Sequence, residues 1–136
     1  MYHINTGVPH TILFVDKIDR VNVNKIGRII RYHNYFSPKG TNVNFVEIIN
    51  KHKIKVRTYE RGVERETLAC GTGSVASSLI STILKKTELP VKVITKNKEI
   101  LKIEKDNNFN IYMSGLVKII NKGTFLLEQG GKGKDV

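Results

Sequence analysis

The sequence predicts a strand-rich α+β domain in which one apolar helix lies inside a curved sheet. Three observations support this fold class. Short apolar or alternating runs, separated by polar turns, recur along the chain and are typical of strands. Residues 72–86 combine apolar with small side chains and carry no charged residue before Lys85, which is typical of a helix covered on most sides. The length of 136 residues fits one modest domain.

The first predicted elements are a buried strand and a helix. Residues 10–15 (HTILFV) form a short apolar run. Asn22 is a suitable N-cap for the following segment, VNKIGRIIRYH, in which isoleucines recur at helical spacing. Residues 37–40 (SPKG) combine proline and glycine and therefore predict a turn that ends this helical segment.

Two strands joined by a polar turn are predicted next. Residues 42–50 and 53–60 are β-like runs on either side of Lys51 and His52. In the second run, KIKVRT, cationic side chains alternate with apolar or hydroxyl ones, which is the pattern of a half-exposed strand. Residues 62–73 are predicted to form a loop that leads into the helix at residues 72–86.

Five short strands are predicted after that helix. Their ranges are 91–95, 99–104, 109–114, 116–121 and 124–128. Polar turns separate them, and the sequence contains no internal repeat. Residues 1–128 are therefore predicted to form a single domain, and residues 129–136 a flexible glycine-rich tail.

The charge of the chain first suggests nucleic-acid binding. Lys and Arg number 23 against 12 Asp and Glu, which gives a formal net charge of +11. Most of the excess is lysine spread singly along the chain, and no RRM, KH or helix-turn-helix signature accompanies it. We therefore expect a solvated lysine-rich surface that binds no nucleic acid, although it can attract an anionic small molecule.

Other features of the composition exclude further classes. No apolar run reaches the ~20 residues that span a bilayer, and the N-terminus does not have the pattern of a signal peptide. One cysteine cannot form an internal disulfide, and four scattered histidines give no zinc-ligand spacing. We expect a cytoplasmic protein with no membrane contact and no metal site.

The segment before the second helix carries the chemistry. Cys70 directly precedes Gly71-Thr72-Gly73, where that helix is predicted to begin. Unpaired N–H groups and the helix dipole favour negative charge at such a position. They are expected to depress the pKa of the thiol and to bind a ligand carboxylate. The alternative is that Cys70 is a small buried apolar residue, as a lone cysteine often is.

A Cys–His–Asp hydrolase is a competing interpretation, since the histidines could pair with the thiol. Histidines occur at positions 3, 10, 33 and 52, and none of them has a local signature that supports this role. Ser74 does not lie in a G-x-S-x-G setting either. The charged residues of the preceding loop (ERGVERE) could simply form a solvated surface.

The run ERGVERETLACGTGSVAS closely resembles the second cysteine motif of diaminopimelate epimerases. Upstream, NTGVPHTILFVDKID and RYHNYFSPKGTNVNFVEI resemble two further blocks of the C-terminal half of these enzymes. Downstream, MSGLVKIINKGTF resembles their closing strands, in the same order. Proline racemases share the cysteine-Gly-Thr-Gly motif but not the ERG…ETLA context, so they match less well.

The resemblance implies a fold and a mechanism. Each half of such an enzyme is a mixed or antiparallel sheet rolled into a barrel around a central helix. The active site lies between the two halves, and each half supplies one cysteine. One thiolate removes the Cα proton of diaminopimelate and the other thiol reprotonates the opposite face, with no cofactor and no metal.

The resemblance also implies roles for seven residues. Cys70 matches the second catalytic cysteine, and Glu60 and His10 match acidic and imidazole groups near the thiols. Arg61 and Asn42 match residues that hold the distal end of the substrate. Gly71 and Thr72 match the backbone that binds the α-carboxylate. Simpler roles stay open for two of them, since Asn42 could be a turn residue and His10 a buried core histidine.

The sequence departs from the family pattern in three ways. Val8 stands where many members have Asn, and Leu116 stands where many have Pro. The third departure is that no second cysteine and no N-terminal half-domain are present in this sequence. We therefore expect that the chain is inactive alone and needs an N-terminal half as its partner. The alternative is an inactive remnant or a binding module on the same fold.

Overall fold

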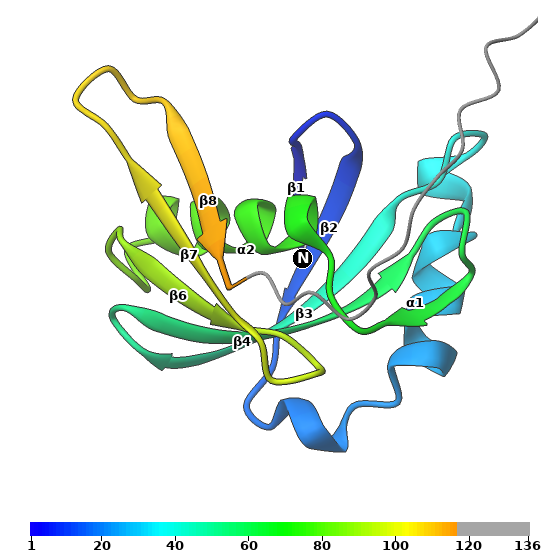
Figure 1. Cartoon of the computed structure of the whole chain (residues 1–136). Coiled ribbons are helices and arrows are strands. Elements are labelled where there is room, and N and C mark those ends of the chain that lie inside the picture. The colour runs from blue at the N-terminus through cyan, green and yellow to red at the C-terminus, as the bar shows by residue number, and fades with distance from the viewer. Residues whose placement is uncertain (117–136) are drawn as a thin grey trace, which may run out of the picture.

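The computed structural model describes residues 1–116, in which eight strands form one mixed sheet that curls around helix α2 (Figure 1). The strands are β1 (Tyr2–Asn5), β2 (Pro9–Phe14), β3 (Asn42–Asn50), β4 (Lys53–Glu60), β5 (Arg65–Thr67), β6 (Val91–Ile94), β7 (Ile100–Lys105) and β8 (Ile111–Gly115). The helices are α1 (Val23–Arg31) and α2 (Gly71–Ile83), with short 3-10 helices at Ile18–Arg20 and Asn34–Phe36. The predicted α+β fold class is confirmed.

The sheet order is β1-β2-β3-β4-β6-β7-β8, and β5 pairs with β4 outside this path. The pairs β2/β3 and β4/β6 are parallel and the other pairs are antiparallel, so the sheet is mixed. Within residues 1–116 the end strands β1 and β8 do not pair with each other, so the described sheet is an open curl. The strands predicted at 124–128 and at nearly all of 116–121, and the tail at 129–136, lie outside the described residues.

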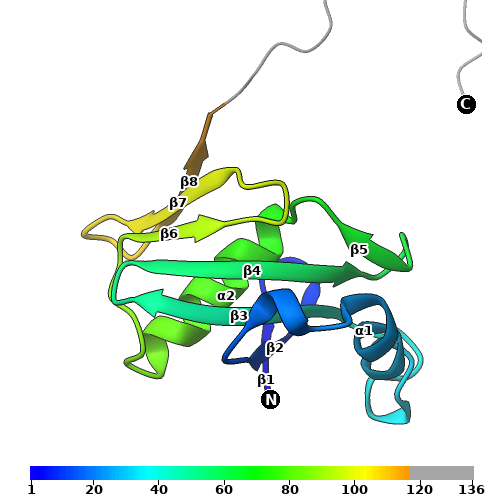
Figure 2. The ribbon, with the colours of Figure 1, turned by 90° about the horizontal axis from the view of Figure 1, so that it is seen from below.

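Strands β3 and β4 have the predicted bounds because the alternation of their side chains is clear. Val46 on β3 and Val56 on β4 point into an apolar cluster shared with α2, whereas Val43 and Phe45 belong to a second cluster on the other face. Helix α1 covers that second face and contacts β3, β4 and β5. Figure 2 shows α1 and α2 on opposite sides of β3 and β4.

Helix α2 is largely enclosed by strands, as predicted. It contacts β1, β2, β3, β4, β6 and β7. Its buried residues are mostly small: Gly73, Ser74, Ala76, Ser77, Ser78, Ile80 and Ser81. Small side chains let the surrounding strands approach the helix axis closely, and that composition was the basis of the prediction. An uncovered stripe remains at Val75 and Leu79, which are half-buried, and at Ile83, which is 68% exposed.

The structure differs from the sequence prediction at three elements. Strand β1, which pairs with β2, is not among the predicted elements. Strand β5 forms within the segment predicted to be a loop, and it consists of only three polar residues that extend the ladder of β4. Helix α2 ends at Ile83 and not at Lys86, since Lys85 adopts a left-handed backbone with φ of 57°. Within residues 1–116, no helix has the length and apolar character needed to cross a membrane.

Candidate active site

The candidate site lies where three strand ends meet the first turn of α2. His10 on β2 is directly opposite Asn42 at the start of β3. The antiparallel pairing of β3 with β4 brings Tyr59, and with it the end of β4 at Glu60, to the same edge of the sheet. Cys70 caps α2 at this edge, so segments far apart in the sequence converge there.

Cys70 is the N-cap residue of α2, as predicted from the sequence. Its backbone is extended (φ −134°, ψ 109°), and its Sγ accepts a hydrogen bond from Gly73 N at 3.4 Å. The hydroxyl Oγ1 of Thr72 lies 3.7 Å from the same sulfur. Cys70 is half-buried, so it is not the fully buried apolar residue of the alternative interpretation. Its reactivity stays a prediction.

Gly73 is required for the close approach of α2 to strand β3. A Cβ atom at this position would collide with Oδ1 of Asn44 and would lie 3.1 Å from the sulfur of Cys70. Gly71 is less constrained, because its nearest neighbour would be the flexible end of Met113, at 2.9 Å. The second glycine of the Gly71-Thr72-Gly73 run is therefore a packing requirement of the site.

The electrostatic surroundings of Cys70 correct one prediction. Burial raises the pKa of its thiol, and the nearby carboxylate of Glu60 adds to that rise. The hydrogen bonds from Gly73 and Thr72 lower this pKa but do not outweigh burial. The prediction of a depressed thiol pKa is therefore wrong for this chain alone, because the sequence does not reveal how far the sulfur is desolvated.

His10 contacts Cys70 through Thr72 and not directly. The ring is 1% exposed, and its Nε2 lies 2.9 Å from Oγ1 of Thr72. Burial lowers the pKa of His10 to about 4, with a smaller contribution from the positive charge of Arg61. The ring is therefore neutral at neutral pH, so it is both a buried histidine and part of the predicted cluster.

Asn42 and Arg61 hold the strand ends together. Oδ1 of Asn42 accepts a hydrogen bond from Arg61 N at 2.7 Å, and its Nδ2 donates to Pro9 O at 3.2 Å. Nη1 of Arg61 donates to Lys39 O at 3.0 Å. Asn42 is 4% exposed, so most of its hydrogen-bonding capacity serves the protein.

All seven predicted residues therefore occupy one region of the molecule, while their individual roles toward a substrate stay predictions. Sequence reasoning missed Asn44, which is fully buried and contacts the ring of His10. The signal was present, since Asn44 lies on the same face of β3 as the core residue Val46. Within residues 1–116, no three His, Cys, Asp or Glu side chains are grouped so that they could hold a metal ion.

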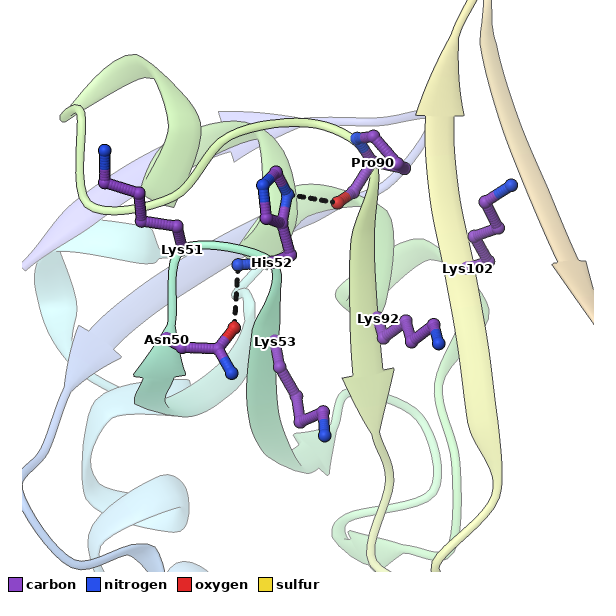
Figure 3. Close-up of a pocket in the computed structure, with 7 residues that line it drawn as sticks. All are labelled: Asn50, Lys51, His52, Lys53, Pro90, Lys92 and Lys102. Atoms are coloured by element: carbon purple, nitrogen blue, oxygen red, sulfur yellow. Dashed lines mark hydrogen bonds between the residues drawn. The ribbon is translucent and has the colours of Figure 1, made fainter.

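A lysine-rich hollow of about 740 Å³ lies at the opposite end of β4 from the candidate site (Figure 3). It is lined by Asn50, Lys51, His52, Lys53, Pro90, Lys92 and Lys102. Lys53, Lys92 and Lys102 are direct neighbours across β4, β6 and β7. Since β4 begins at Lys53 and ends at Glu60, the hollow is separate from Cys70.

Comparison with known proteins gives a consistent result for sequence and fold. The family model described as diaminopimelate epimerase matches residues 2–120. The chain is 48% identical to a diaminopimelate epimerase of Aquifex aeolicus over 124 residues, which are 88% of this chain and 44% of that protein. It is 46% identical to a diaminopimelate epimerase of a Hydrogenobaculum species over 130 residues, which are 93% of this chain and 47% of that protein.

The chain therefore spans about half the length of these curated relatives. Among solved structures, a phenazine biosynthesis protein of the PhzF family from Bacillus anthracis aligns with a TM-score of 0.55 and 20% identity. That alignment covers 82% of this chain and 35% of the other. A second such protein, from Clostridium difficile, aligns with a TM-score of 0.52 and 17% identity over 74% of this chain and 35% of the other. At this identity the likeness concerns the fold.

Proposed function

This chain belongs to the diaminopimelate epimerase family, and from that premise we propose that it is one half of a two-thiol epimerase. Its proposed substrate is diaminopimelate, whose LL and meso forms it interconverts when an N-terminal half supplies the second cysteine. This reaction belongs to the formation of lysine and of peptidoglycan precursors, which we place in the cytoplasm. The proposal needs no cofactor, because the two thiols serve as base and acid.

The observation that carries the proposal is the position of Cys70. A half-buried sulfur caps α2 near the carboxylate of Glu60, at the edge of the sheet where Arg61 acts on His10. A base at this position can approach only one face of a substrate carbon. Inversion of a stereocentre by proton transfer needs an acid on the other face, and this chain has a single cysteine.

The proposed step is balanced in protons. A thiolate removes the Cα proton and becomes a thiol, and the electron pair of the C–H bond moves toward the α-carboxylate. The opposing thiol then donates its proton to the other face of Cα and becomes the thiolate. The two cysteines exchange protonation states in each turnover, so Cys70 is the base in one direction and the acid in the other.

The first turn of α2 is the proposed site for the α-carboxylate. Within residues 1–116, no acceptor receives a hydrogen bond from the N–H of Gly71 or of Thr72. Free N–H groups at a helix N-terminus bind carboxylates and stabilise the negative charge that develops on them. Arg61 is the proposed partner for the distal carboxylate of the substrate, since its guanidinium can donate two parallel hydrogen bonds.

Asn42 and Glu60 complete the proposed substrate contacts. Asn42 retains one hydrogen on Nδ2 and lone pairs on Oδ1 beyond its bonds to Pro9 and Arg61. Glu60 is the proposed acidic group beside the thiol, since its carboxylate is close enough to raise the pKa of Cys70. His10 contributes through Thr72 and is not proposed to exchange a proton with the substrate.

The test is reconstitution with a separately produced N-terminal half. The corresponding segment of the Aquifex aeolicus relative is suitable, because the two C-terminal halves are 48% identical. We expect solvent deuterium to enter the substrate at Cα only in the reconstituted pair. In that pair Cys70→Ser should abolish most exchange, whereas Lys17→Ala, far from the site, should not.

Two outcomes would contradict the proposal. Exchange by the chain alone would show that the second thiol is not needed. A pair that associates and binds diaminopimelate without exchange would favour the binding-module alternative.

A further inference from the structure

A chain of polar contacts runs from the buried core of the sheet, through His10, to Thr72 and the sulfur of Cys70 at the surface. Nδ2 of Asn44 lies 3.0 Å from Nδ1 of His10, and Nε2 of His10 lies 2.9 Å from Oγ1 of Thr72. The same hydroxyl lies 3.7 Å from Sγ of Cys70. Asn44 is 0% exposed and His10 is 1% exposed, so water cannot readily replace the contact between these two side chains. Thr72 is exposed.

The orientation of the Asn44 amide is fixed by its two other partners. Nδ2 donates to Thr11 O at 3.2 Å, and a carbonyl can only accept. Oδ1 accepts from Oγ1 of Thr58 at 2.9 Å. Rotating the amide by half a turn would place two acceptors against each other at Thr11. Nδ2 therefore faces His10 as a donor, and Nδ1 of His10 must be the acceptor.

This assignment sets the direction of each later hydrogen bond. A neutral imidazole that accepts at Nδ1 carries its hydrogen on Nε2. Nε2–H then donates to Oγ1 of Thr72, which leaves the hydroxyl hydrogen free to point at the sulfur of Cys70. Without Asn44, the other tautomer would accept the hydroxyl hydrogen and remove the donor from the sulfur.

We propose that Asn44 is a positioning residue that holds His10 as the Nε2–H tautomer and thereby directs the hydroxyl of Thr72 toward the sulfur of Cys70. The importance of this arrangement for turnover rests on the proposed function, in which Cys70 is the reacting thiol. The charged group that acts on the sulfur is the carboxylate of Glu60 from β4, while Arg61 acts on His10, which is neutral. The thiolate thus receives hydrogen bonds from Gly73 N and from Thr72.

The first measurement is the tautomer itself. Nitrogen NMR of the imidazole rings in the intact chain at neutral pH distinguishes the two tautomers and the charged ring, and a His10→Gln variant identifies the signals of His10. We expect a hydrogen on Nε2 only. A hydrogen on Nδ1, or a charged ring, would overturn the proposal without any variant at Asn44.

The second measurement uses the rate of Cys70 alkylation by iodoacetamide, which follows the thiolate fraction. Asn44→Asp replaces the donor by an acceptor, so the tautomer should switch and alkylation at neutral pH should slow about tenfold, because the thiolate loses one hydrogen bond. Thr72→Val should slow alkylation equally without switching the tautomer. Thr72→Ser keeps the hydroxyl and should restore the rate.

Thr58→Val is the matched control. It removes the hydrogen bond to Oδ1 of Asn44 but keeps both hydrogen bonds of Nδ2, so the tautomer and the alkylation rate should change little. If Thr58→Val slows alkylation as much as Asn44→Asp does, the effect is general loosening and the proposal is wrong. If Asn44→Asp does not fold, the proposal is still tested by the tautomer of His10 in the wild-type chain and by the alkylation rates of Thr72→Val and Thr72→Ser.

These measurements need neither substrate nor a second half. A reconstituted pair without epimerase activity would therefore count against the proposed function and leave the tautomer result intact.

Discussion

His10 on β2 and Thr72 on α2 are joined by a contact of 2.9 Å between Nε2 and Oγ1, although 62 positions separate them in the sequence. This contact ties the central helix to the strand that begins the candidate site. Because the imidazole is buried and titratable, both the stability of the domain and the environment of Cys70 depend on its protonation state.

The first prediction concerns this dependence on pH. Burial lowers the pKa of His10 to about 4 from an ordinary value of 6.5, so between these values the unfolded chain binds more protons than the folded chain. The free energy of unfolding should therefore be independent of the protonation of His10 above pH 6.5. It should fall by up to about 3 kcal/mol as the pH decreases from 6.5 to 4. Urea unfolding across this range measures the change. His10→Gln should show a flatter pH dependence, and equal slopes for the two proteins would contradict the prediction.

The second prediction compares two glycines in one helical turn. Gly73→Ala should lower the free energy of unfolding by about 1–3 kcal/mol, because its Cβ would collide with Asn44 and crowd Cys70. Gly71→Ala is the matched control and should cost less, since only the flexible end of Met113 must move. Urea denaturation of the two variants tests this order. Equal losses would mean that the contact between α2 and β3 is not the constraint described above.

The third prediction concerns the charge beside the thiol. Glu60 raises the pKa of Cys70, so Glu60→Gln should lower it and should increase the alkylation rate at neutral pH by about two- to fourfold. The midpoint of the wild-type alkylation profile should lie at a higher pH than that of a free cysteine, because burial raises the pKa of the thiol more than its hydrogen bonds lower it. Alkylation as a function of pH measures both effects. Glu64→Gln, in the turn that follows β4, is the control, and an equal increase in alkylation rate from it would show that the effect is not local to Glu60.

The fourth prediction concerns the lysine row, which is formed by Lys53, Lys92 and Lys102 on neighbouring strands (Figure 3). Lys92 lies directly between Lys53 and Lys102, and like charges directly opposite each other destabilise a sheet. Lys102 pairs with Glu104 at 2.9 Å, whereas within residues 1–116 neither Lys53 nor Lys92 forms an ion pair. Lys92→Glu should therefore stabilise the fold by about 0.2–1 kcal/mol, and less at high salt.

Thermal unfolding at low and high salt provides the measurement for the lysine row. Lys17→Glu changes the net charge equally but lies outside the row, so it separates local repulsion from overall charge. A larger gain from Lys17→Glu than from Lys92→Glu would contradict the prediction.

Local patterns in the sequence predicted much of the fold. The bounds of β3 and β4 follow from side-chain alternation, and Asn22 caps α1 as expected, accepting from Lys25 N at 3.1 Å. Strand β5 was missed because its three polar residues have no apolar pattern of their own and depend on β4 for pairing. Local propensity does not contain that information.

The sequence predicted which residues form the candidate site but not their electrostatic surroundings. The cluster around Cys70 could be proposed because the resemblance to a family connects distant residues. The raised pKa of Cys70 could not, since desolvation depends on the complete packing around the sulfur. The contact of Asn44 with His10 likewise arises from the pairing of β2 with β3, which no local pattern specifies.

The two parallel strand pairs have a consequence for how the thiol reaches its place. Connections between parallel neighbouring strands are almost always right-handed. The chain passes from β2 to β3 through α1 and from β4 to β6 through α2, and strand direction reverses between β3 and β4. Two crossovers of the same hand on oppositely directed strands must place their helices on opposite faces of the sheet. The position of α2, with Cys70 at its first turn, on the face of the sheet opposite α1 therefore follows from chain chirality.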